Sequence, residues 1–537
     1  MEPHDNSDWI WWKHGVIYQI YPMSFFDSND DGVGDIPGII AKLDYLHGLG
    51  IDAIWLSPVY KSPMLDFGYD VSDYRQIDPV FGTLEDLKLL LEKAHLLGIR
   101  VIMDMVINHT SDNHRWFLES RSSKDNPKHD WYIWRDGRYG GPPNNWKSFY
   151  GGSSWEYDGG TNQFYLHTFL KQQPDLNWRN KELRSAVFKE LVFWLDLGVD
   201  GFRLDAMNMV GKQKRLKSIP DLFGFLFFFR QYRKYNQPAS YKFGRKLRNL
   251  LNNYDDKMSV GEIFTLPPGD PSRVASYLED GDNSIHLAFD FSIIFRSWNA
   301  RKYYRCIERW YSKIPEKGWP CNVLSNHDLL RSIDRFRLRR NKEAKAKVAA
   351  TFLLTLKGTP FIYYGEEIGM RNANIKRGDI RDPLGKRFWP FFKGRDRART
   401  PMQWSDGPEA GFTRGKPWLP VNHNHKIINV IKQKEDSTSL YHHYETLIRI
   451  RKEHKALHLG EWMPLVKGDH NIIAYYRIFM DEKILVALNF SNKPRMIHLE
   501  NDGKGTLLYS THRVIRKIFK NNKIILLPFE SFIMKMA

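Results

Sequence analysis

The 537-residue sequence lacks most features that would place a protein outside the cell or across a membrane. It has only two cysteines, Cys306 and Cys321, so a disulfide framework is not expected and a reducing compartment is favoured. Its first residues, MEPHDNSDWIWW, contain no basic region followed by an apolar one, so no signal peptide is evident. The longest apolar cluster, Phe223–Phe229, is far shorter than the roughly 20 residues that span a bilayer. We therefore expect a cytoplasmic protein with no membrane partner.

Acidic residues are in deficit, with 62 Asp and Glu against 80 Lys and Arg and a formal net charge of +18. Such a balance can indicate a nucleic acid or an anionic membrane as partner. The basic residues are scattered, however, with only small clusters at 212–217, 335–347 and 512–523, and no nucleic-acid motif accompanies them. We expect a solvated basic surface and no nucleic-acid partner.

Short apolar runs alternate with amphipathic helical patterns along most of the chain. Residues 83–97 form one helical pattern, with Thr83 and Asp86 placed as a capping box, and residues 39–49 and 181–197 form two others. Eight runs read as buried parallel strands: 16–22, 51–58, 99–106, 199–206, 258–263, 287–291, 321–327 and 359–364. Eight strand–helix units predict an α/β protein with a (β/α)8 TIM barrel.

Two parts of the chain interrupt or follow this alternation. Residues 110–175 are rich in Gly, Asn, Trp, Tyr and Ser and lack a helical period, which predicts a small inserted domain after strand three. After a helical pattern at 439–457, short strand patterns such as 471–476, 484–490, 505–508 and 523–527 predict a C-terminal antiparallel β-sandwich. We therefore divide the chain into barrel (1–109), inserted domain (110–175), barrel (176–457) and sandwich (458–537).

Three carboxylates stand at the ends of predicted buried strands: Asp205, Glu262 and Asp328. A buried carboxylate is costly unless it is paired or hydrogen-bonded, so stability does not explain this placement. Barrel enzymes place their catalytic groups at these strand ends. The pattern therefore predicts an active site built from the three carboxylates.

Several motifs resemble the α-amylase superfamily, glycoside hydrolase family thirteen. IMDMVINH, GFRLDAMN, SVGEIF and NVLSNHD are similar to its conserved regions, and GVIYQIYPMSF, FGYDVSDY, QPDLNW and RARTPMQW look like its α-glucosidase and oligo-1,6-glucosidase branch. The resemblance runs from about Val16 to the C-terminus. It implies a hydrolase that acts on small oligosaccharides without a catalytic cofactor, and it implies no oligomeric state.

The resemblance also implies catalytic roles. Asp205 becomes the nucleophile of a retaining mechanism, Glu262 the acid and then base, and Asp328 the carboxylate that holds sugar hydroxyls. Arg203 lies two residues before Asp205, so strand alternation turns both side chains to one side, and we expect its charge to keep Asp205 ionised. Asp104 is expected to support Arg203 from behind.

Residues matching the family's sugar-binding positions follow from the same resemblance. His109 and His327 match histidines that hydrogen-bond a glucose unit, and Tyr69 matches a tyrosine that stacks on it. Asp70 is expected to pair with Arg399 and close the cleft into a pocket, which implies release of one terminal glucose at a time. Two further residues are expected as aromatic walls: Phe169 and Tyr150.

Linkage preference is predicted from the residue after the nucleophile. In this branch valine there accompanies action on α-1,6 bonds, whereas threonine or alanine accompanies α-1,4 action, and this chain has Ala206. We therefore expect maltose and short malto-oligosaccharides to be better substrates than isomaltose. Two alternative functions remain: an oligo-1,6-glucosidase, and a glucosyltransferase or isomerase such as a trehalose synthase. Alanine at this position also occurs in trehalose synthases, and residues 213–241 depart from the sequence of the branch. A non-catalytic binding subunit is disfavoured by the three carboxylates.

The loop DSNDDGVGD places oxygen donors at the spacing of the first nine positions of a calcium-binding EF-hand loop. The terminal bidentate Glu of such loops is replaced by Gly38. The family has a structural calcium or magnesium site here, so we expect Ca2+ or Mg2+ to bind this loop, away from the chemistry. The expected ligands are Asp27, Asn29, Asp31, Val33 through its carbonyl, and Asp35.

Overall fold

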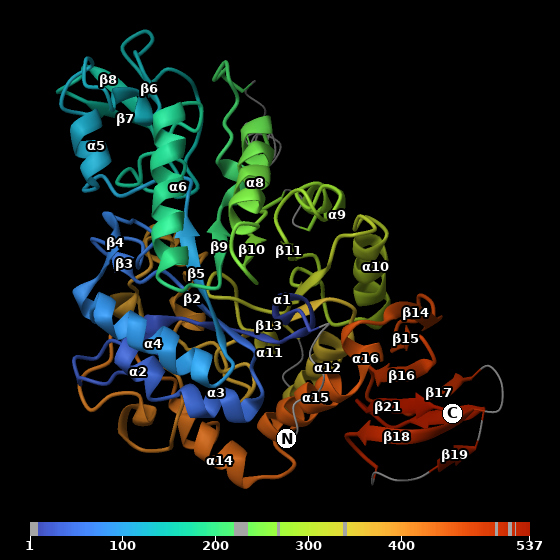
Figure 1. Ribbon diagram of the computed structural model, residues 1–537. Coiled ribbons are helices and arrows are strands. Elements are labelled where there is room, and N and C mark those ends of the chain that lie inside the picture. Colours follow the sequence, from blue (N-terminus) through green and yellow to red (C-terminus); the bar gives the residue numbers. More distant parts are fainter. Residues whose placement is uncertain are drawn as a thin grey trace.

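The computed structural model describes residues 9–219, 235–265, 269–336, 341–499, 503–513, 518–520 and 522–537. Its centre is a closed barrel of eight parallel strands in the order β1-β13-β12-β11-β10-β9-β5-β2 (Figure 1). The strands are β1 (Ile17–Ile20), β2 (Ala53–Leu56), β5 (Arg100–Val106), β9 (Gly201–Asp205), β10 (Met258–Gly261), β11 (Leu287–Asp290), β12 (Cys321–Val323) and β13 (Thr359–Tyr363). All eight predicted strands are present, so the barrel prediction is confirmed.

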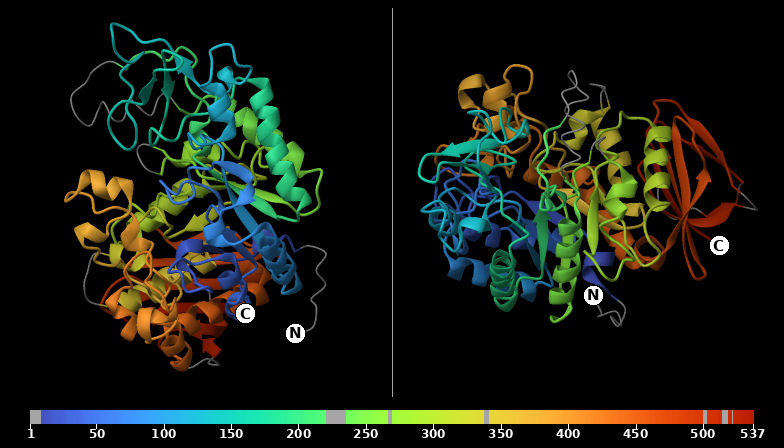
Figure 2. Two further views of the ribbon diagram at one scale, coloured as in Figure 1. Left: turned by 90° about the vertical axis from the view of Figure 1, so that its left-hand side faces the viewer. Right: turned by 90° about the horizontal axis from the view of Figure 1, so that it is seen from above.

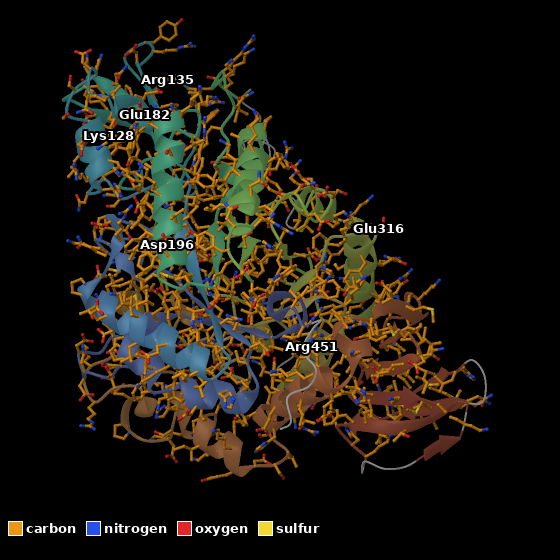
Figure 3. All side chains as sticks on the ribbon, viewed as in Figure 1. Lys128, Arg135, Glu182, Asp196, Glu316 and Arg451 are labelled. Carbon is orange, nitrogen blue, oxygen red and sulfur yellow. The ribbon has the colours of Figure 1, made fainter. Side chains whose placement is uncertain are left out.

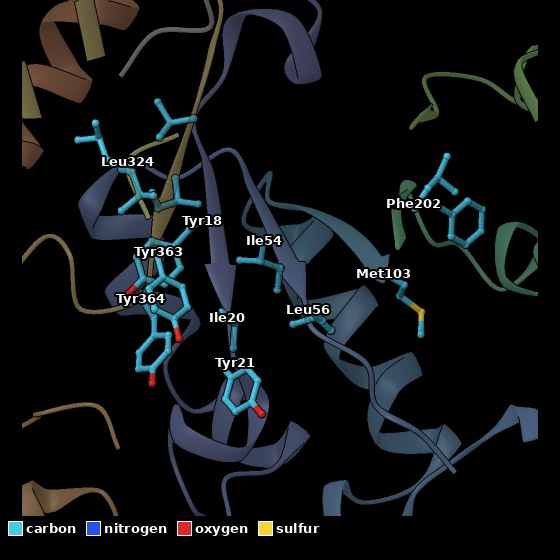
Figure 4. Packing of buried hydrophobic residues seen from close by; sticks show 14 of the residues in the cluster. Tyr18, Ile20, Tyr21, Ile54, Leu56, Met103, Phe202, Leu324, Tyr363 and Tyr364 are labelled. Atoms are coloured by element: carbon cyan, nitrogen blue, oxygen red, sulfur yellow. The ribbon is translucent and has the colours of Figure 1, made fainter. Parts of the chain in front are cut away.

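Each barrel strand is buried on both faces because alternate side chains point to opposite sides. In β2, Ala53 and Trp55 belong to the apolar cluster that fills the barrel. Ile54 and Leu56 belong instead to the larger cluster between the strands and the surrounding helices (Figure 4). A strand buried on both sides reads as one continuous apolar run, and this is why the sequence identified it.

Helices cover the outside of the barrel (Figures 1 and 2). Helix α4 (Leu84–Leu96) begins at the predicted capping box of Thr83 and Asp86, and α6 (Lys181–Asp196) also matches its prediction. The pattern at 39–49 forms two helices, α2 (Ile36–Ile40) and α3 (Leu43–Leu49). The others are α1 (Trp11–His14), α8 (Pro238–Leu251), α9 (Pro271–Ala275), α10 (Ala300–Tyr311), α11 (Ser332–Arg335), α12 (Lys342–Thr355), α13 (Pro383–Phe388), α14 (Val430–Glu435), α15 (Leu440–Glu453) and α16 (Lys455–His458).

The segment after β5 leaves the barrel, as predicted. It carries helix α5 (Arg115–Ser120) and a small antiparallel sheet of β6 (Trp134–Arg135), β8 (Gln163–Leu166) and β7 (Trp155–Asp158). Another two-stranded sheet, β3 (Tyr60–Lys61) and β4 (Asp73–Ile77), follows β2. A β-bridge between His109 and Asp175 joins the two ends of the excursion, so its base is fixed where β5 ends.

The C-terminal part forms two antiparallel sheets beside the barrel (Figure 2). The six-stranded sheet contains β14 (Glu461–Val466), β15 (Ile472–Phe479), β16 (Glu482–Asn489), β21 (Ser531–Met536), β18 (Lys504–Ser510) and β19 (Ile518–Lys520), and the two-stranded sheet contains β17 (Arg495–His498) and β20 (Lys523–Leu526). The buried Arg451 of α15, labelled in Figure 3, donates to the carbonyls of Leu354, Gly358 and Leu457 and so joins α15 to α12 and α16. The buried Arg477 of β15 donates to the carbonyls of Thr355 and Leu457, which ties the six-stranded sheet to these helices. The sandwich is confirmed, although we had not predicted β14, β17, β19 and β21.

The cysteines and the possibility of a membrane-spanning helix were two further subjects of prediction. Cys306 and Cys321 are buried and unpaired, as the absence of a disulfide framework requires. Within the described ranges, no helix is long and apolar enough to cross a membrane. The domain limits at 109/110, 175/176 and 457/458 stay predictions, and residues 220–234 of the divergent segment 213–241 lie outside the described residues.

Candidate active site

The three predicted carboxylates lie at the carboxyl end of the barrel. Asp205 is the last residue of β9, and Glu262 directly follows β10. Asp328 lies five residues beyond β12, in the loop that leaves the barrel. The backbone N–H of Glu262 donates to the Leu204 carbonyl at 3.0 Å, so the pairing of β9 and β10 extends to the first two carboxylates and brings them together.

Arg203 is the hub of the site. Its Nη1 lies 2.7 Å from Asp205 Oδ1 and 2.9 Å from Asp104 Oδ1, and its Nη2 lies 2.8 Å from Glu262 Oε2. The guanidinium is almost completely buried. The expectation that Arg203 and Asp205 share one side of the strand is therefore confirmed, and so is the supporting position of Asp104. One fixed cation holds the two carboxylates that a retaining mechanism needs.

Burial changes how these carboxylates titrate. Burial raises the pKa of Glu262, and the negative charge of Asp328 adds to this effect while Arg203 opposes it. Burial also raises the pKa of Asp205 well above its usual value, because it outweighs Arg203 and acts together with the charge of Glu262. Arg203 lowers the pKa of Asp205, as we expected, but burial and the charge of Glu262 outweigh this effect. Two buried carboxylates on one guanidinium titrate as a pair, and the repulsion between their charges makes the pair hold a proton more strongly than two separate carboxyl groups would.

Asp328 has a different electrostatic environment. Burial opposes its ionisation, but His327 and the guanidiniums of Arg395 and Arg399 outweigh burial and hold the pKa of Asp328 well below its usual range. Arg399 Nη2 lies 2.8 Å from Asp328 Oδ1, and Arg395 Nη1 lies 3.1 Å from the same oxygen. The site therefore contains one permanently ionised carboxylate beside a pair that can hold a proton.

The expected pair of Asp70 and Arg399 is not formed. The Asp70 carboxylate is buried and accepts hydrogen bonds from Ser62 Oγ and from the backbone N–H groups of Leu65 and Asp66. Arg399 contacts Asp328 and the His327 carbonyl instead. The loop folds around Asp70, which leaves no direction in which that side chain could reach Arg399.

The acid–arginine pair in the cavity is made by Asp66 and Arg395. Arg395 Nη2 lies 2.7 Å from Asp66 Oδ1, and Tyr150 Oη donates to Asp66 Oδ2 at 2.9 Å. The Tyr150 hydroxyl also accepts from Arg395 Nη2 at 3.0 Å. Each residue stands four positions before the one we had chosen, in the same two motifs. The signal was present in SPMLDFGYD and GRDRARTPMQW.

The cavity above the carboxylates has a volume of about 240 Å3. Of the predicted sugar-binding residues, Tyr69, His109, Phe169, Tyr150 and Ala206 line it, whereas Asp70, Arg203, His327 and Arg399 lie behind the lining. Residues that the sequence did not indicate complete the lining: Asp66, Phe149, Met209, Phe264, Phe291, Phe295, Asn326, Leu329, Leu384, Phe392 and Arg395. Small-molecule sites combine such apolar walls with a few fixed polar groups.

The two histidines are fixed by neighbours. His327 stacks on Tyr69, with ring centroids 5.3 Å apart and an interplanar angle of 1°, and its Nε2 lies 2.6 Å from the Tyr69 hydroxyl. His109 Nε2 lies 3.0 Å from the Tyr69 carbonyl. Burial lowers the pKa of His109 to about 4, so this ring is neutral at pH 7. Tyr69 thus connects both histidines to one wall of the cavity.

Ala206 has a strained backbone. Its φ is 45° and its ψ is 37°, the left-handed region that few non-glycine residues adopt and β-branched residues avoid. In this conformation its N–H lies 3.2 Å from Glu262 Oε2, and its methyl group packs with Met209 and Tyr235. The residue after Asp205 therefore contacts both the acid/base carboxylate and the cavity wall.

The predicted metal loop is held together by hydrogen bonds of its own. Asp27 accepts from the backbone of Asn29 and Gly32, Asn29 accepts from Asp31, and Asp31 accepts from Val33. Asp35 caps helix α2 by accepting from Gly38. These oxygens suit Ca2+ in type. However, the described residues contain no group of three or more His, Cys, Asp or Glu side chains arranged to hold a metal ion, so the metal stays a prediction.

A closed parallel barrel with paired carboxylates at its carboxyl end defines a glycoside-hydrolase type of enzyme. Residues 19–460 match the family model for the alpha-amylase catalytic domain. The chain is 42% identical to an oligo-1,6-glucosidase of Parageobacillus thermoglucosidasius, over 94% of each sequence, and 40% identical to a probable alpha-glucosidase of Rhizobium meliloti, over 91% of each. The chain therefore belongs to the alpha-amylase family of glycoside hydrolases, as its motifs indicated.

Solved structures extend the likeness to enzymes that transfer glucose. The trehalulose synthase MutB of Pseudomonas mesoacidophila MX-45 superposes with a TM-score of 0.90 at 37% identity, over 98% of this chain and 99% of that one. An alpha-glucosyl transfer enzyme, XgtA, superposes with a TM-score of 0.91 at 40% identity, over 99% and 100%. The same fold thus serves proteins named for hydrolysis and proteins named for transfer.

Proposed function

We propose that this enzyme is an exo-acting, retaining α-glucosidase that releases terminal glucose from short oligosaccharides, with α-1,4 bonds preferred. Asp205 attacks the anomeric carbon and forms a covalent glucosyl intermediate. Glu262 protonates the departing oxygen and then takes a proton from the water that releases glucose. The observation that carries the proposal is the contact of both carboxylates with the single guanidinium of Arg203, which fixes them side by side.

Closure of the cavity supports exo-action. Asp66, Arg395 and Tyr150 form one hydrogen-bonded cluster in its wall, so the role that the resemblance gave to Asp70 and Arg399 falls to Asp66 and Arg395. A bidentate arginine and a carboxylate can bind a fixed pair of sugar hydroxyls. Asp328, held ionised by the arginines, supplies the third carboxylate, and Tyr69 with His109 contacts the same sugar.

Product analysis tests the proposal. Maltose, isomaltose, trehalose and sucrose are incubated separately with the enzyme, and all products are separated over time. Release of glucose from maltose with little from isomaltose supports the α-1,4 assignment. The similarity to oligo-1,6-glucosidases and to trehalulose synthase favours two alternatives, and these would be recognised by faster cleavage of isomaltose or by conversion of a disaccharide mainly into another disaccharide.

Substitution at Asp66 distinguishes the observed pair from the expected one. Asp66→Asn removes the charge that faces Arg395, so kcat/KM for maltose is expected to fall by roughly a hundredfold, about 3 kcal/mol, through loss of the sugar contact. Asp70→Asn is the matched control, because that carboxylate binds only its own loop and its loss lowers the melting temperature first. Steady-state kinetics and thermal melts of both variants decide the matter. A kcat/KM for maltose equal to that of the parent in Asp66→Asn would show that Asp66 does not contact the sugar.

Ala206→Val tests linkage preference. The branched side chain adds bulk beside the bond that is cut, so we expect the ratio of isomaltose to maltose turnover to rise. Because the backbone at 206 is left-handed, valine should also cost about 1–3 kcal/mol of stability. Ala206→Thr is the matched control, with the same branching and strain but the residue type that accompanies α-1,4 action. Equal ratios of isomaltose to maltose turnover in the valine and threonine variants would show that residue 206 does not determine linkage preference.

Calcium binding by the Asp27 loop is tested separately from catalysis. After chelation, excess Ca2+ or Mg2+ should raise the melting temperature, since a ligand at a hundred times its Kd stabilises a fold by about 2.7 kcal/mol. Asp31→Asn should abolish that shift and leave kcat unchanged. An identical melting temperature with and without either ion would show that the loop is held by its hydrogen bonds alone.

A further inference from the structure

A second and larger cavity adjoins the catalytic one. It has a volume of about 930 Å3 and lies between helix α10 and the loop that follows β11. Phe295 lines both cavities, and Leu330 of the larger cavity follows Leu329 of the catalytic cavity. Phe295 therefore borders both spaces, which places the larger space next to the catalytic one.

Cationic side chains dominate the lining of this second space, which we call the basic cavity. Its cations are Arg296, Lys302, Arg305, Arg309 and Arg335. Of its two acids, Asp334 pairs with Lys342, whereas Glu308 keeps its charge and accepts a hydrogen bond from the Tyr304 hydroxyl at 2.6 Å. The cations of the cavity therefore outnumber its acids.

The exposed cations of the basic cavity are not neutralised. Within the part of the chain that the structure describes, Arg296, Lys302, Arg305 and Arg309 form no ion pair with a carboxylate at 4.0 Å or less. Lys302 donates only to Ser297 Oγ, at 2.8 Å. A concave surface with several unpaired charges of one sign attracts ligands of the opposite sign.

Helix α10 has a charge pattern that opposes its own stability. Lys302, Arg305 and Arg309 are three and four residues apart, which places them on one face, and like charges at this spacing destabilise a helix. The first turn of α10 contains no acidic residue but does contain Arg301 and Lys302, although the positive end of the helix dipole favours acids there. Local rules are broken in this way most often where a protein binds something.

Arg335 adds a cation that is fixed in place. Its Nε donates to the Leu330 carbonyl at 3.0 Å, and its two other nitrogens donate to the carbonyls of Ile294 and Leu324. These neutral partners orient the guanidinium without cancelling its charge. The basic cavity thus combines one anchored arginine with a row of arginine and lysine side chains on α10.

Neutral sugars alone would not require this arrangement. The catalytic cavity is lined by four carboxylates, Asp66, Asp205, Glu262 and Asp328. An anionic sugar would be repelled from them unless cations held its charge at a distance. The basic cavity provides those cations next to the catalytic cavity.

We propose that the basic cavity binds a phosphate ester on the leaving-side sugar, so that phosphorylated disaccharides are preferred over neutral ones. Arginine recognises phosphate oxygens in a bidentate manner, and a phosphate monoester carries close to two negative charges at neutral pH. This substrate class rests on the proposed glucosidase function. The presence of the anion site itself does not depend on it.

Glucose 6-phosphate is the probe, because it stands for the leaving-side product. Its inhibition of para-nitrophenyl α-glucoside hydrolysis is compared with that of glucose, and its binding is measured independently by calorimetry. Glucose 6-phosphate should bind at least about tenfold more tightly than glucose, as one charge-assisted contact suffices for this difference. The double variant Arg305→Gln/Arg309→Gln should lose that advantage while its turnover of the aryl glucoside is unchanged.

Two comparisons make the test specific. Lys242→Gln/Lys246→Gln on α8 removes the same net charge at the same spacing outside the cavity, and it should keep the advantage. Glucuronic acid should bind less tightly than glucose 6-phosphate, because a carboxylate has fewer oxygens and less charge than a phosphate monoester.

Each outcome has one meaning for the proposal. Equal binding of glucose and glucose 6-phosphate by an enzyme that hydrolyses the aryl glucoside would overturn the anion site and leave the proposed function intact. Loss of binding in both double variants alike would also overturn it, since net charge would then be the cause. Tight, Arg305-dependent binding by a protein without aryl-glucosidase activity would support the anion site and refute the glucosidase function.

Discussion

Asp205→Asn is expected to lower kcat for maltose by at least about ten-thousandfold, because removal of a nucleophile abolishes the covalent step and leaves only binding effects. The asparagine has nearly the same shape and can still accept a hydrogen bond from Arg203. It also removes one negative charge from a buried group of like charges that includes Glu262 and Asp104. We therefore expect the variant to fold with a melting temperature that is not lowered. Initial rates with maltose and a thermal melt provide the two measurements.

The control for this variant is a residue in the same charged cluster that does not touch the cavity. Asp104 contacts the same guanidinium, and Asp104→Asn should retain far more activity than Asp205→Asn because Asp104 positions Arg203 and Tyr69 without lining the cavity. Comparable losses in the two variants would indicate that the charge balance around Arg203, and not a nucleophile at Asp205, governs turnover.

Glu262→Gln is expected to lose activity selectively. On maltose, whose leaving oxygen needs a proton, kcat should fall by about 10²–10⁴-fold, the usual contribution of general acid catalysis. On an activated aryl glucoside, whose leaving group departs without acid help, the first step should remain much closer to the parent rate. Paired measurements on the two substrates report this selectivity. Equal losses on both substrates would remove Glu262 from the acid role.

The pH profile of the parent should carry the same signature. Burial raises the pKa of Glu262, so it keeps its proton to a higher pH than an ordinary glutamic acid and loses it as the pH rises through that raised value. The parent's kcat/KM for maltose is therefore expected to fall on the alkaline side. Glu262→Gln has no such proton to lose, so its residual activity on the aryl glucoside should lack this alkaline limb. Persistence of the limb would assign it to another group.

The barrel could be predicted because its strands are buried on both faces and its helices have clear boundaries. Within the run at 51–58, residues 53–56 are all apolar, since Trp55 fills the barrel while Ile54 packs under the helices. The sandwich was only half predicted. Strand β14 contains Pro464, which in a sequence argues against a strand, and β17 has a single buried apolar residue, Ile497.

The motifs that form the site were predicted correctly, but within two of them the wrong acid or arginine was chosen. Asp205, Glu262 and Asp328 follow strand ends, and strand geometry alone brings the first two together on Arg203. Asp66 and Arg395 lie on irregular loops, where no periodicity tells which of two acids or arginines faces the cavity. Only the folded loop shows that Asp70 is occupied by the N–H groups of Leu65 and Asp66. Likewise, the left-handed backbone of Ala206 leaves no mark in composition.

Only the structure shows where in the fold a part of the excess positive charge lies. In the sequence, the excess of basic residues is spread over many short clusters and was interpreted as a solvated surface. The spacing of Lys302, Arg305 and Arg309 on α10 is visible in the sequence, but their position around a cavity next to the catalytic one is not. The positions of these residues around the basic cavity are what led to the hypothesis of an anion site.

The anomeric form of the glucose first released tests the central claim most directly. Hydrolysis of maltose is followed by proton NMR at early times, before the sugar equilibrates between its two anomers. Two successive displacements, by Asp205 and then by water, retain configuration, so α-glucose should accumulate first. Initial release of β-glucose would mean a single displacement by water and would contradict a covalent intermediate on Asp205.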